Sequence, residues 1–203
     1  MPMSPNVEKY FANVSRETIY KLDKFVQLVM KWNQSINLIS ADDEGLIWER
    51  HILDCYCFAK YIVEQKTVVD IGSGGGFPAI IIALCTNNYV TMVESDRRKA
   101  IFLNEVTRKL ELKNVKVINE RCEKILPICA DIITARACAP LKVFLDIASS
   151  HLSKNGEIWL LKGKSIKDEI ILANDWVFDY QLYESECSDG YIINIKNLSR
   201  KTI

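Results

Sequence analysis

Side chains that bind metals are scarce in this sequence. Its 203 residues include two histidines, and none of its seven cysteines belongs to a CxxC pair with the spacing of a zinc site. Cys55 and Cys57 stand too close together for a usual ligand pair. The apolar surroundings of several cysteines are typical of small hydrophobic side chains in a reducing compartment. We therefore expect no metal site.

Long apolar runs and an export leader are also missing. No run reaches the ~18 residues that a membrane helix needs. The first residues, MPMSPNVEKY, lack the basic-then-apolar layout of a signal peptide. We therefore expect a cytoplasmic protein that makes no membrane contact.

The formal net charge is zero, so the chain as a whole lacks the basic excess that marks many nucleic-acid-binding proteins. The basic residues are unevenly placed, however. From Arg97 to Lys124, nine lysines and arginines stand against four glutamates. This segment is either an ordinary solvated helix face or a patch that faces RNA, and charge alone does not separate the two.

Hydrophobic periodicity divides the chain at about residue 65. Before it, the pattern predicts a helix within residues 15–35 and a second helix over about 43–63, which should turn Leu46 inward. After it, short β-branched strands alternate with helices, a pattern typical of a parallel sheet covered on both faces. We predict an N-terminal helical cap at 1–64 and an α/β domain at 65–203, in one compact unit.

Seven segments of the second part are predicted to be strands. The last two flank a turn at Ser188–Gly190 and suggest an antiparallel edge. The predicted fold is therefore a Rossmann-like, seven-stranded α/β sheet, mostly parallel with an antiparallel edge strand. The predicted strands are 67–71, 89–93, 115–119, 131–135, 156–161, 178–183 and 191–195.

A glycine-rich loop follows the first predicted strand. Gly72, Gly74 and Gly76 lie where open α/β sheets bind ligands, and glycine lets the backbone turn tightly beside a ligand. A dinucleotide-binding loop would have a glycine where Phe77 stands, so a compact ligand without a pyrophosphate fits better. Asp70, just before the loop, is placed to hold the turn and to face an ammonium group of the ligand.

Two further acidic positions point to a nucleoside in the ligand. Glu94 ends the second predicted strand, where a carboxylate accepts hydrogen bonds from ribose hydroxyls. The run Arg121–Glu123 follows the third strand, where the adenine of a bound nucleoside would lie. Together with the glycine loop, these residues predict S-adenosylmethionine as the cofactor and methyl transfer as the reaction.

Several catalytic motifs are absent. The sequence has no phosphate-binding GxxxxGK[ST] loop, no GxSxG elbow, no Asn/Asp-Pro-Pro-aromatic run and no Pro-Cys nucleophile. Guanine N7 suits an enzyme without a base, because its free lone pair attacks a sulfonium methyl group without first losing a proton. Such catalysis needs positioning and electrostatics. Arg136, at the fourth strand, has a planar fork that fits a guanine edge, a phosphate or the cofactor carboxylate.

At these motifs the chain resembles the bacterial small-subunit ribosomal RNA guanine-N7 methyltransferases, also called the glucose-inhibited division protein B family. The resemblance covers nearly all of the chain from about Leu28 onward. It rests on Lys31–Asn33 with Asn37–Leu38, Arg50–Asp54, Asp70–Pro78, Glu94–Ser95 with Lys99, Phe102–Leu103, Arg121–Glu123, Ala135–Ala137 and Leu161–Gly163.

The resemblance implies a class I methyltransferase fold and an S-adenosylmethionine-binding domain at 65–203. It further implies that Arg50 and His51, in the cap, face the substrate. Lys162, at the end of the fifth predicted strand, is a candidate for contact with an RNA phosphate. The residues that the resemblance places against S-adenosylmethionine are Gly72, Phe77, Cys122, Glu123 and Arg136.

The family's reaction is methylation of N7 of a guanosine in the 530 loop of 16S ribosomal RNA. We therefore expect 16S RNA or the small ribosomal subunit as the partner, and a monomeric enzyme. Two alternatives remain open: a small-molecule methyltransferase on the same fold, since a fold does not settle the substrate, and a non-catalytic nucleoside-binding module.

Overall fold

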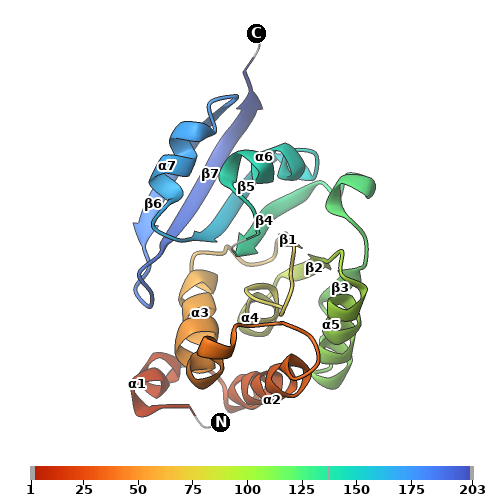
Figure 1. Cartoon of the computed structure of the whole chain (residues 1–203), viewed down its shortest axis with the longest axis vertical. Helices are drawn as coiled ribbons and strands as arrows, with labels where there is room; N and C mark the ends of the chain where they lie inside the picture. Colours follow the sequence, from red (N-terminus) through yellow and green to blue (C-terminus); the bar gives the residue numbers. More distant parts are fainter. Residues whose placement is uncertain (1–2, 137, 202–203) are drawn as a thin grey trace.

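A seven-stranded sheet forms the centre of the computed structural model, which describes residues 3–136 and 138–201 (Figure 1). The strand order is β3-β2-β1-β4-β5-β7-β6; β7 runs antiparallel to β5 and β6, and the other pairs are parallel. This confirms the predicted fold class. The strands are β1 (Thr67–Ile71), β2 (Tyr89–Val93), β3 (Val115–Ile118), β4 (Ala130–Arg136), β5 (Leu152–Lys162), β6 (Trp176–Glu184) and β7 (Tyr191–Arg200).

The strand order reverses between β1 and β4. From β1 the chain builds outward through β2 and β3, and then returns to β4 on the other side of β1. At such a switch point the loops after the two strands diverge and leave a crevice at their carboxyl ends. The glycine loop follows β1, so the fold places it at this crevice.

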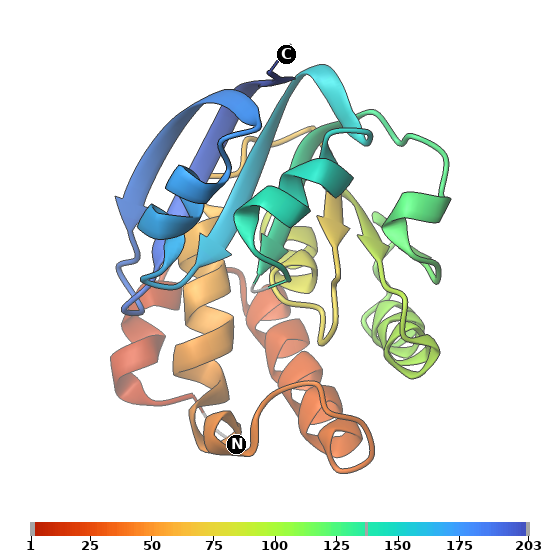
Figure 2. The ribbon, with the colours of Figure 1, turned by 45° about the horizontal axis from the view of Figure 1, so that its top comes forward.

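Helices cover both faces of the sheet (Figures 1 and 2). Buried residues alternate between two cores: Val68 packs with the core under α4 and α5, whereas Val69 packs with the core under α6 and α7. This is the period of two expected for a strand buried on both faces. These helices are α4 (Ala79–Cys85), α5 (Arg97–Lys109), α6 (Leu141–Ala148) and α7 (Ile166–Leu172), with a short 3-10 turn η4 (Cys122–Lys124) after β3.

The N-terminal helices pack on the α4–α5 side. Ser15 caps α2 by accepting a hydrogen bond from the amide of Thr18, as its position before the periodic segment predicts. The elements of this region are α1 (Pro5–Glu8), η1 (Lys9–Phe11), α2 (Arg16–Asn33), η2 (Ala41–Leu46), η3 (Trp48–Leu53) and α3 (Asp54–Ala59).

The prediction of one regular helix over 43–63 is wrong in its detail. The segment starts as a 3-10 helix, continues as the π-helical η3, and becomes α-helical only from Asp54 to Ala59. The change of winding rotates the inward face, so Leu46 is 41% exposed although Ile47 is fully buried. A pattern that assumes 3.6 residues per turn cannot follow such a change.

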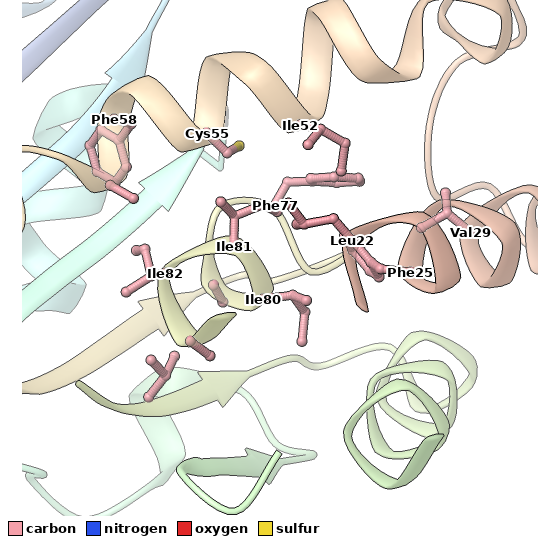
Figure 3. Packing of buried hydrophobic residues seen from close by; sticks show 14 of the residues in the cluster. Leu22, Phe25, Val29, Ile52, Cys55, Phe58, Phe77, Ile80, Ile81 and Ile82 are labelled. Carbon is pink, nitrogen blue, oxygen red and sulfur yellow. The ribbon is translucent and has the colours of Figure 1, made fainter. Parts of the chain in front are cut away.

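Side chains of the N-terminal helices interlock with the glycine loop and α4. In Figure 3, Phe77 lies among Leu22 and Phe25 of α2, Ile52 of η3 and the isoleucines of α4. One continuous hydrophobic core therefore joins the segment 1–64 to one face of the sheet. We propose that the two parts fold as a single unit.

The hydrophobic pattern predicts the turn of the closing hairpin and the start of β7, but not the length of either strand, since β6 begins at Trp176, before the predicted strand at 178–183. β7 continues to Arg200, five residues past the last fully buried isoleucine, Ile195, and pairs there with the beginning of β6. The pairing shifts register between Val177 and Asp179, and the polar residues beyond Ile195 lie on an exposed ribbon. Backbone pairing outside the core leaves no apolar alternation, so the sequence does not signal it.

Candidate active site

The glycine loop and the segment after β4 touch at the switch point. Gly72 has a φ of +72°, and a Cβ atom added there would lie 2.6 Å from Sγ of Cys138. Both the backbone conformation and this close approach require glycine. The loop is therefore held directly against Cys138.

Glu94 fixes the shape of the loop. Its Oε2 accepts a hydrogen bond from the amide of Gly74 at 2.8 Å, and its Oε1 accepts one from the amide of Asp96 at 2.7 Å. Gly74 itself has a φ of +53°. A carboxylate has about four acceptor positions, so Glu94 retains acceptor capacity for ribose hydroxyls. Its role toward the ribose stays a prediction.

A hollow of about 270 Å³ lies beside the loop. It brings three predicted cofactor residues together: Gly72 from the loop, and Cys122 and Glu123 from η4. Cys138, which follows β4, also lines the hollow, and no motif in the sequence assigns it to the cofactor. The other residues of its wall are Ile71, Val93, Ser95, Glu120, Arg121, Ala139 and Ile147.

Asp70 is a buried carboxyl with an unused oxygen. Its Oδ1 accepts a hydrogen bond from the hydroxyl of Thr134 at 2.8 Å, its partner across the β1–β4 pair, but Oδ2 has no partner among the described residues. Burial raises the pKa of Asp70 to about 7. A buried acceptor without a donor is unfavourable, so this position fits a ligand that brings an ammonium or another donor.

Arg136, at the end of β4, binds the N-terminal cap. Its Nη1 donates to Nδ1 of His51 at 2.7 Å, and its Nη2 donates to the backbone oxygen of Arg50 at 2.7 Å. Nη2 also lies 3.5 Å from Oδ2 of Asp54. The structure thus brings together Arg136, Arg50 and His51, three of the residues predicted to bind the substrate. The contacts of Arg136, however, are to the cap.

His51 is neutral in this arrangement. Burial, and next the charge of Arg136, lower the pKa of His51 to about 4. Because an arginine only donates, Nδ1 of His51 is the acceptor, and the ring proton resides on Nε2, which lies 3.3 Å from Oδ2 of Asp43. Hydrogen bonds from Arg50 and Ser40 in turn hold the pKa of Asp43 at about 2.

A second cavity, of about 500 Å³, opens next to Arg136. Its walls come from three places: the cap, the carboxyl ends of β4 and β5, and the turn between β6 and β7. The residues of its wall are Asp43, Arg50, Asp54, Arg136, Leu161, Lys162, Gly163, Cys187, Ser188, Asp189 and Gly190.

Lys162 does not lie as a phosphate-binding lysine should. Its side chain is 8% exposed, and its Nζ forms an ion pair of 2.7 Å with Glu169 and donates to the backbone oxygen of Ala139. The sequence shows a lysine at the end of a strand but cannot show that Glu169 of α7 neutralises it. The geometry argues against the predicted contact with RNA.

Phe77 is also placed differently from a ligand-facing side chain. It is 7% exposed, and its ring packs 4.9 Å from the ring of His51 and 5.2 Å from that of Phe25. Any contact of Phe77 with a cofactor would therefore come from its backbone. Ala137, which belongs to the run quoted for the family resemblance, lies outside the described residues.

Within residues 3–136 and 138–201, no group of three His, Cys, Asp or Glu side chains is arranged to hold a metal ion. None of the helices in this part of the chain is both long and apolar enough to cross a membrane.

Comparison with known proteins identifies close relatives. Residues 18–187 match the family model GidB, described as rRNA small subunit methyltransferase G. The chain is 44% identical over 189 residues to the ribosomal RNA small subunit methyltransferase G of Gluconobacter oxydans (strain 621H), covering 92% of this chain and 97% of that protein. It is 40% identical over 190 residues to the protein of the same name from Rickettsia akari (strain Hartford), covering 92% and 98%.

Solved structures share the fold at lower identity. A SAM-dependent methyltransferase from Aquifex aeolicus superposes with a TM-score of 0.60 at 18% identity, covering 85% of this chain and 97% of that one. TYW2 of M. jannaschii, crystallised in complex with AdoMet, gives a TM-score of 0.59 at 20% identity, covering 74% and 76%. These similarities confirm the class I methyltransferase fold.

Proposed function

The chain belongs to the GidB family, rRNA small subunit methyltransferase G, and we propose that it methylates N7 of a guanosine in the 530 loop of 16S ribosomal RNA. The family makes the chain an S-adenosylmethionine-dependent rRNA methyltransferase. Its relatives are ribosomal RNA methyltransferases by name, which favours RNA over a small molecule as the substrate. We propose the position of the methylated guanosine, in the 530 loop, and the atom that accepts the methyl group, N7.

The crevice at the switch point fits the cofactor. The loop at Gly72 and Gly74, together with Cys122 and Glu123, would hold its nucleoside, and the unpartnered Oδ2 of Asp70 would accept from its ammonium group. When bound, S-adenosylmethionine supplies a methyl group carried on a positively charged sulfur. The chain's own contribution is to hold the acceptor atom in place and keep its lone pair free.

The state of His51 carries the N7 assignment. The lone pair of His51 Nδ1 already accepts from Arg136, and its pKa of about 4 leaves little basicity at neutral pH. The other histidine, His151, is buried and lies 3.0 Å from the backbone oxygen of Cys122. Neither imidazole is placed as a general base. This arrangement suits guanine N7 as the methyl acceptor, because N7 carries no proton that must be removed.

Exposed basic side chains flank the crevice. Arg97 and Arg98 begin α5, which follows β2 after a short loop, and Arg121 precedes η4, so all three lie near the carboxyl ends of strands. We propose that they contact RNA phosphates, which predicts binding that weakens as salt is added. We also propose that the enzyme acts as a monomer on the small ribosomal subunit in the cytoplasm.

The test uses small subunits and naked 16S RNA from a strain that lacks this enzyme. Methyl transfer from labelled S-adenosylmethionine, followed by primer extension after cleavage at N7-methylguanosine, should locate one methyl group in the 530 loop. With saturating cofactor, the single-turnover rate should show no base-like ionisation between about pH 6 and 9. A methyl group on an amino nitrogen, or a clear base pKa in that step, would contradict the N7 assignment.

A further inference from the structure

The 500 Å³ cavity has a mixed wall that is unlike an apolar small-molecule pocket. The cap contributes Asp43, Arg50 and Asp54, β4 contributes Arg136, and the β6–β7 turn contributes Ser188. The cavity opens at the carboxyl ends of β4 and β5, where its wall residue Lys162 donates to the backbone oxygen of Ala139, a wall residue of the cofactor hollow. A molecule in the cavity would therefore lie next to the cofactor site.

Asp54 is the cavity residue with the most unusual surroundings. It is 4% exposed, and its Oδ1 accepts hydrogen bonds from the hydroxyls of Ser185 at 3.0 Å and Ser188 at 2.9 Å. Its Oδ2 accepts no hydrogen bond from the described residues and has only the guanidinium of Arg136 at 3.5 Å. One oxygen is thus fixed by the turn, while the other retains its capacity to accept.

Asp43, a second acid in the cavity wall, already has hydrogen-bond donors for both of its carboxylate oxygens. Asp43 accepts from Arg50 at 2.7 Å on Oδ1 and from the hydroxyl of Ser40 at 2.7 Å on Oδ2, where His51 also lies. Asp43 is therefore committed to the cap, and Asp189 is exposed and pairs with Lys164 at 3.3 Å. Asp54 is thus the buried acid of the wall that can accept from a ligand.

We infer that this cavity receives the target guanine, turned out of the RNA, and that Asp54 accepts hydrogen bonds from the N1–H and 2-amino groups of its Watson–Crick edge. This inference rests on the proposed function. Guanine presents two adjacent donors on that edge, which match the two acceptor positions of Oδ2, whereas adenine offers no donor at N1 and none at C2. N7 is on the opposite edge and stays free. Asp54 is thus a specificity-determining residue.

The experiment compares guanosine with inosine, which keeps N7, O6 and N1–H but lacks the 2-amino group. Small subunits are reconstituted from 16S RNA ligated to carry either base at the target position, and kcat/KM for methyl transfer is measured. The enzymes are the wild type, Asp54→Asn and the control Asp146→Asn. Asp146 also faces an arginine, Arg200, at 3.5 Å, but it belongs to α6 on the opposite side of the sheet.

The wild type should prefer guanosine by about tenfold to a hundredfold, the effect of one hydrogen bond to a charged group. Asp54→Asn should lower the guanosine rate by a similar factor and reduce the preference to about threefold or less. Asp146→Asn should keep both. If Asp54→Asn does not fold, as judged by binding of S-adenosylmethionine, Ser188→Ala replaces it and should reduce the preference severalfold.

Two results would overturn the inference: a wild type that methylates inosine as well as guanosine, or an Asp54→Asn enzyme with the wild-type preference. The proposed function fails separately. It fails if the wild type transfers no methyl group to the guanosine-containing subunit, or transfers it to an atom other than N7.

Discussion

The replacement Asp70→Asn should make the ligand-free protein more stable at neutral pH. Asparagine keeps the acceptor for the Thr134 hydroxyl and places an uncharged amide where Oδ2 has no partner. In the wild type, burial raises the pKa of Asp70 from 3.8 to about 7. Folding therefore favours the protonated acid, and ionising it in the folded protein is unfavourable.

The sign and size follow from this difference in pKa. Below about pH 3 the carboxyl is largely protonated in both the folded and the unfolded chain, so the stability loss is nearly absent. The loss grows as the pH rises and levels off above the folded pKa of about 7, at about 4 kcal/mol. Between about pH 5 and 8 it should increase by ~2.5 kcal/mol.

Urea unfolding of both proteins at several pH values measures this effect. His51 destabilises the folded state as the pH falls, because its folded pKa of about 4 lies below the ordinary value, so the wild type alone would show two opposing trends. Both proteins contain His51, and the difference between them isolates Asp70. A difference in unfolding free energy that stays constant from pH 5 to 8 would refute the reasoning. Saturating S-adenosylmethionine should shrink the pH-dependent difference if its ammonium group meets Oδ2.

Four further substitutions test the rest of the site. Gly74→Val should abolish cofactor binding in a folded protein, measured by calorimetry, because valine is strained at a φ of +53°. Glu94→Ala should weaken the cofactor by about 1.5–3 kcal/mol in the same assay, since the Gly74 amide loses its partner. Arg136→Lys should lower the single-turnover rate although the charge is kept, because one ammonium cannot replace the fork. Lys162→Ala should leave the salt dependence of RNA binding unchanged. It should lower the unfolding free energy by about 2–3 kcal/mol, because Glu169 loses its ion-pair partner. A decrease of about one in the slope of log binding constant against log salt concentration would instead support the predicted contact with a phosphate.

Much of the fold can be predicted because its signals are local. The runs at Thr67–Ile71 and Tyr89–Val93 are strands with the predicted ends, since both are short, apolar and bounded by turn residues. The position of the glycine loop follows from the β–α alternation alone. The predicted grouping of Gly72 with Cys122 and Glu123 could be made because they follow β1 and β3, parallel strands whose carboxyl ends lie at the same edge of the sheet with β2 between them.

The remainder depends on contacts between segments far apart in the chain. Asn33, part of the run that carried the resemblance, accepts from the amides of Leu38 and Ile39 and donates to Glu44, so it shapes the loop after α2. Neither the hydrophobic periodicity nor a sequence motif predicts that role of Asn33. The neutralisation of Lys162 by Glu169 is equally hidden, because pairing depends on where α7 packs.

Arg136 shows why the cap and the site are difficult to separate. Both of its Nη atoms bind the cap, through His51 and the backbone of Arg50, and Asp54 lies beside the same guanidinium. A guanidinium has five N–H donors. While Arg136 keeps these contacts, only its remaining N–H groups can donate to a ligand. The residue proposed to read guanine and the residue at the end of β4 thus share one ion pair. Moving the cap would change the charge in the cavity proposed for the acceptor base, so the N-terminal helices contribute to the candidate site as well as to the core.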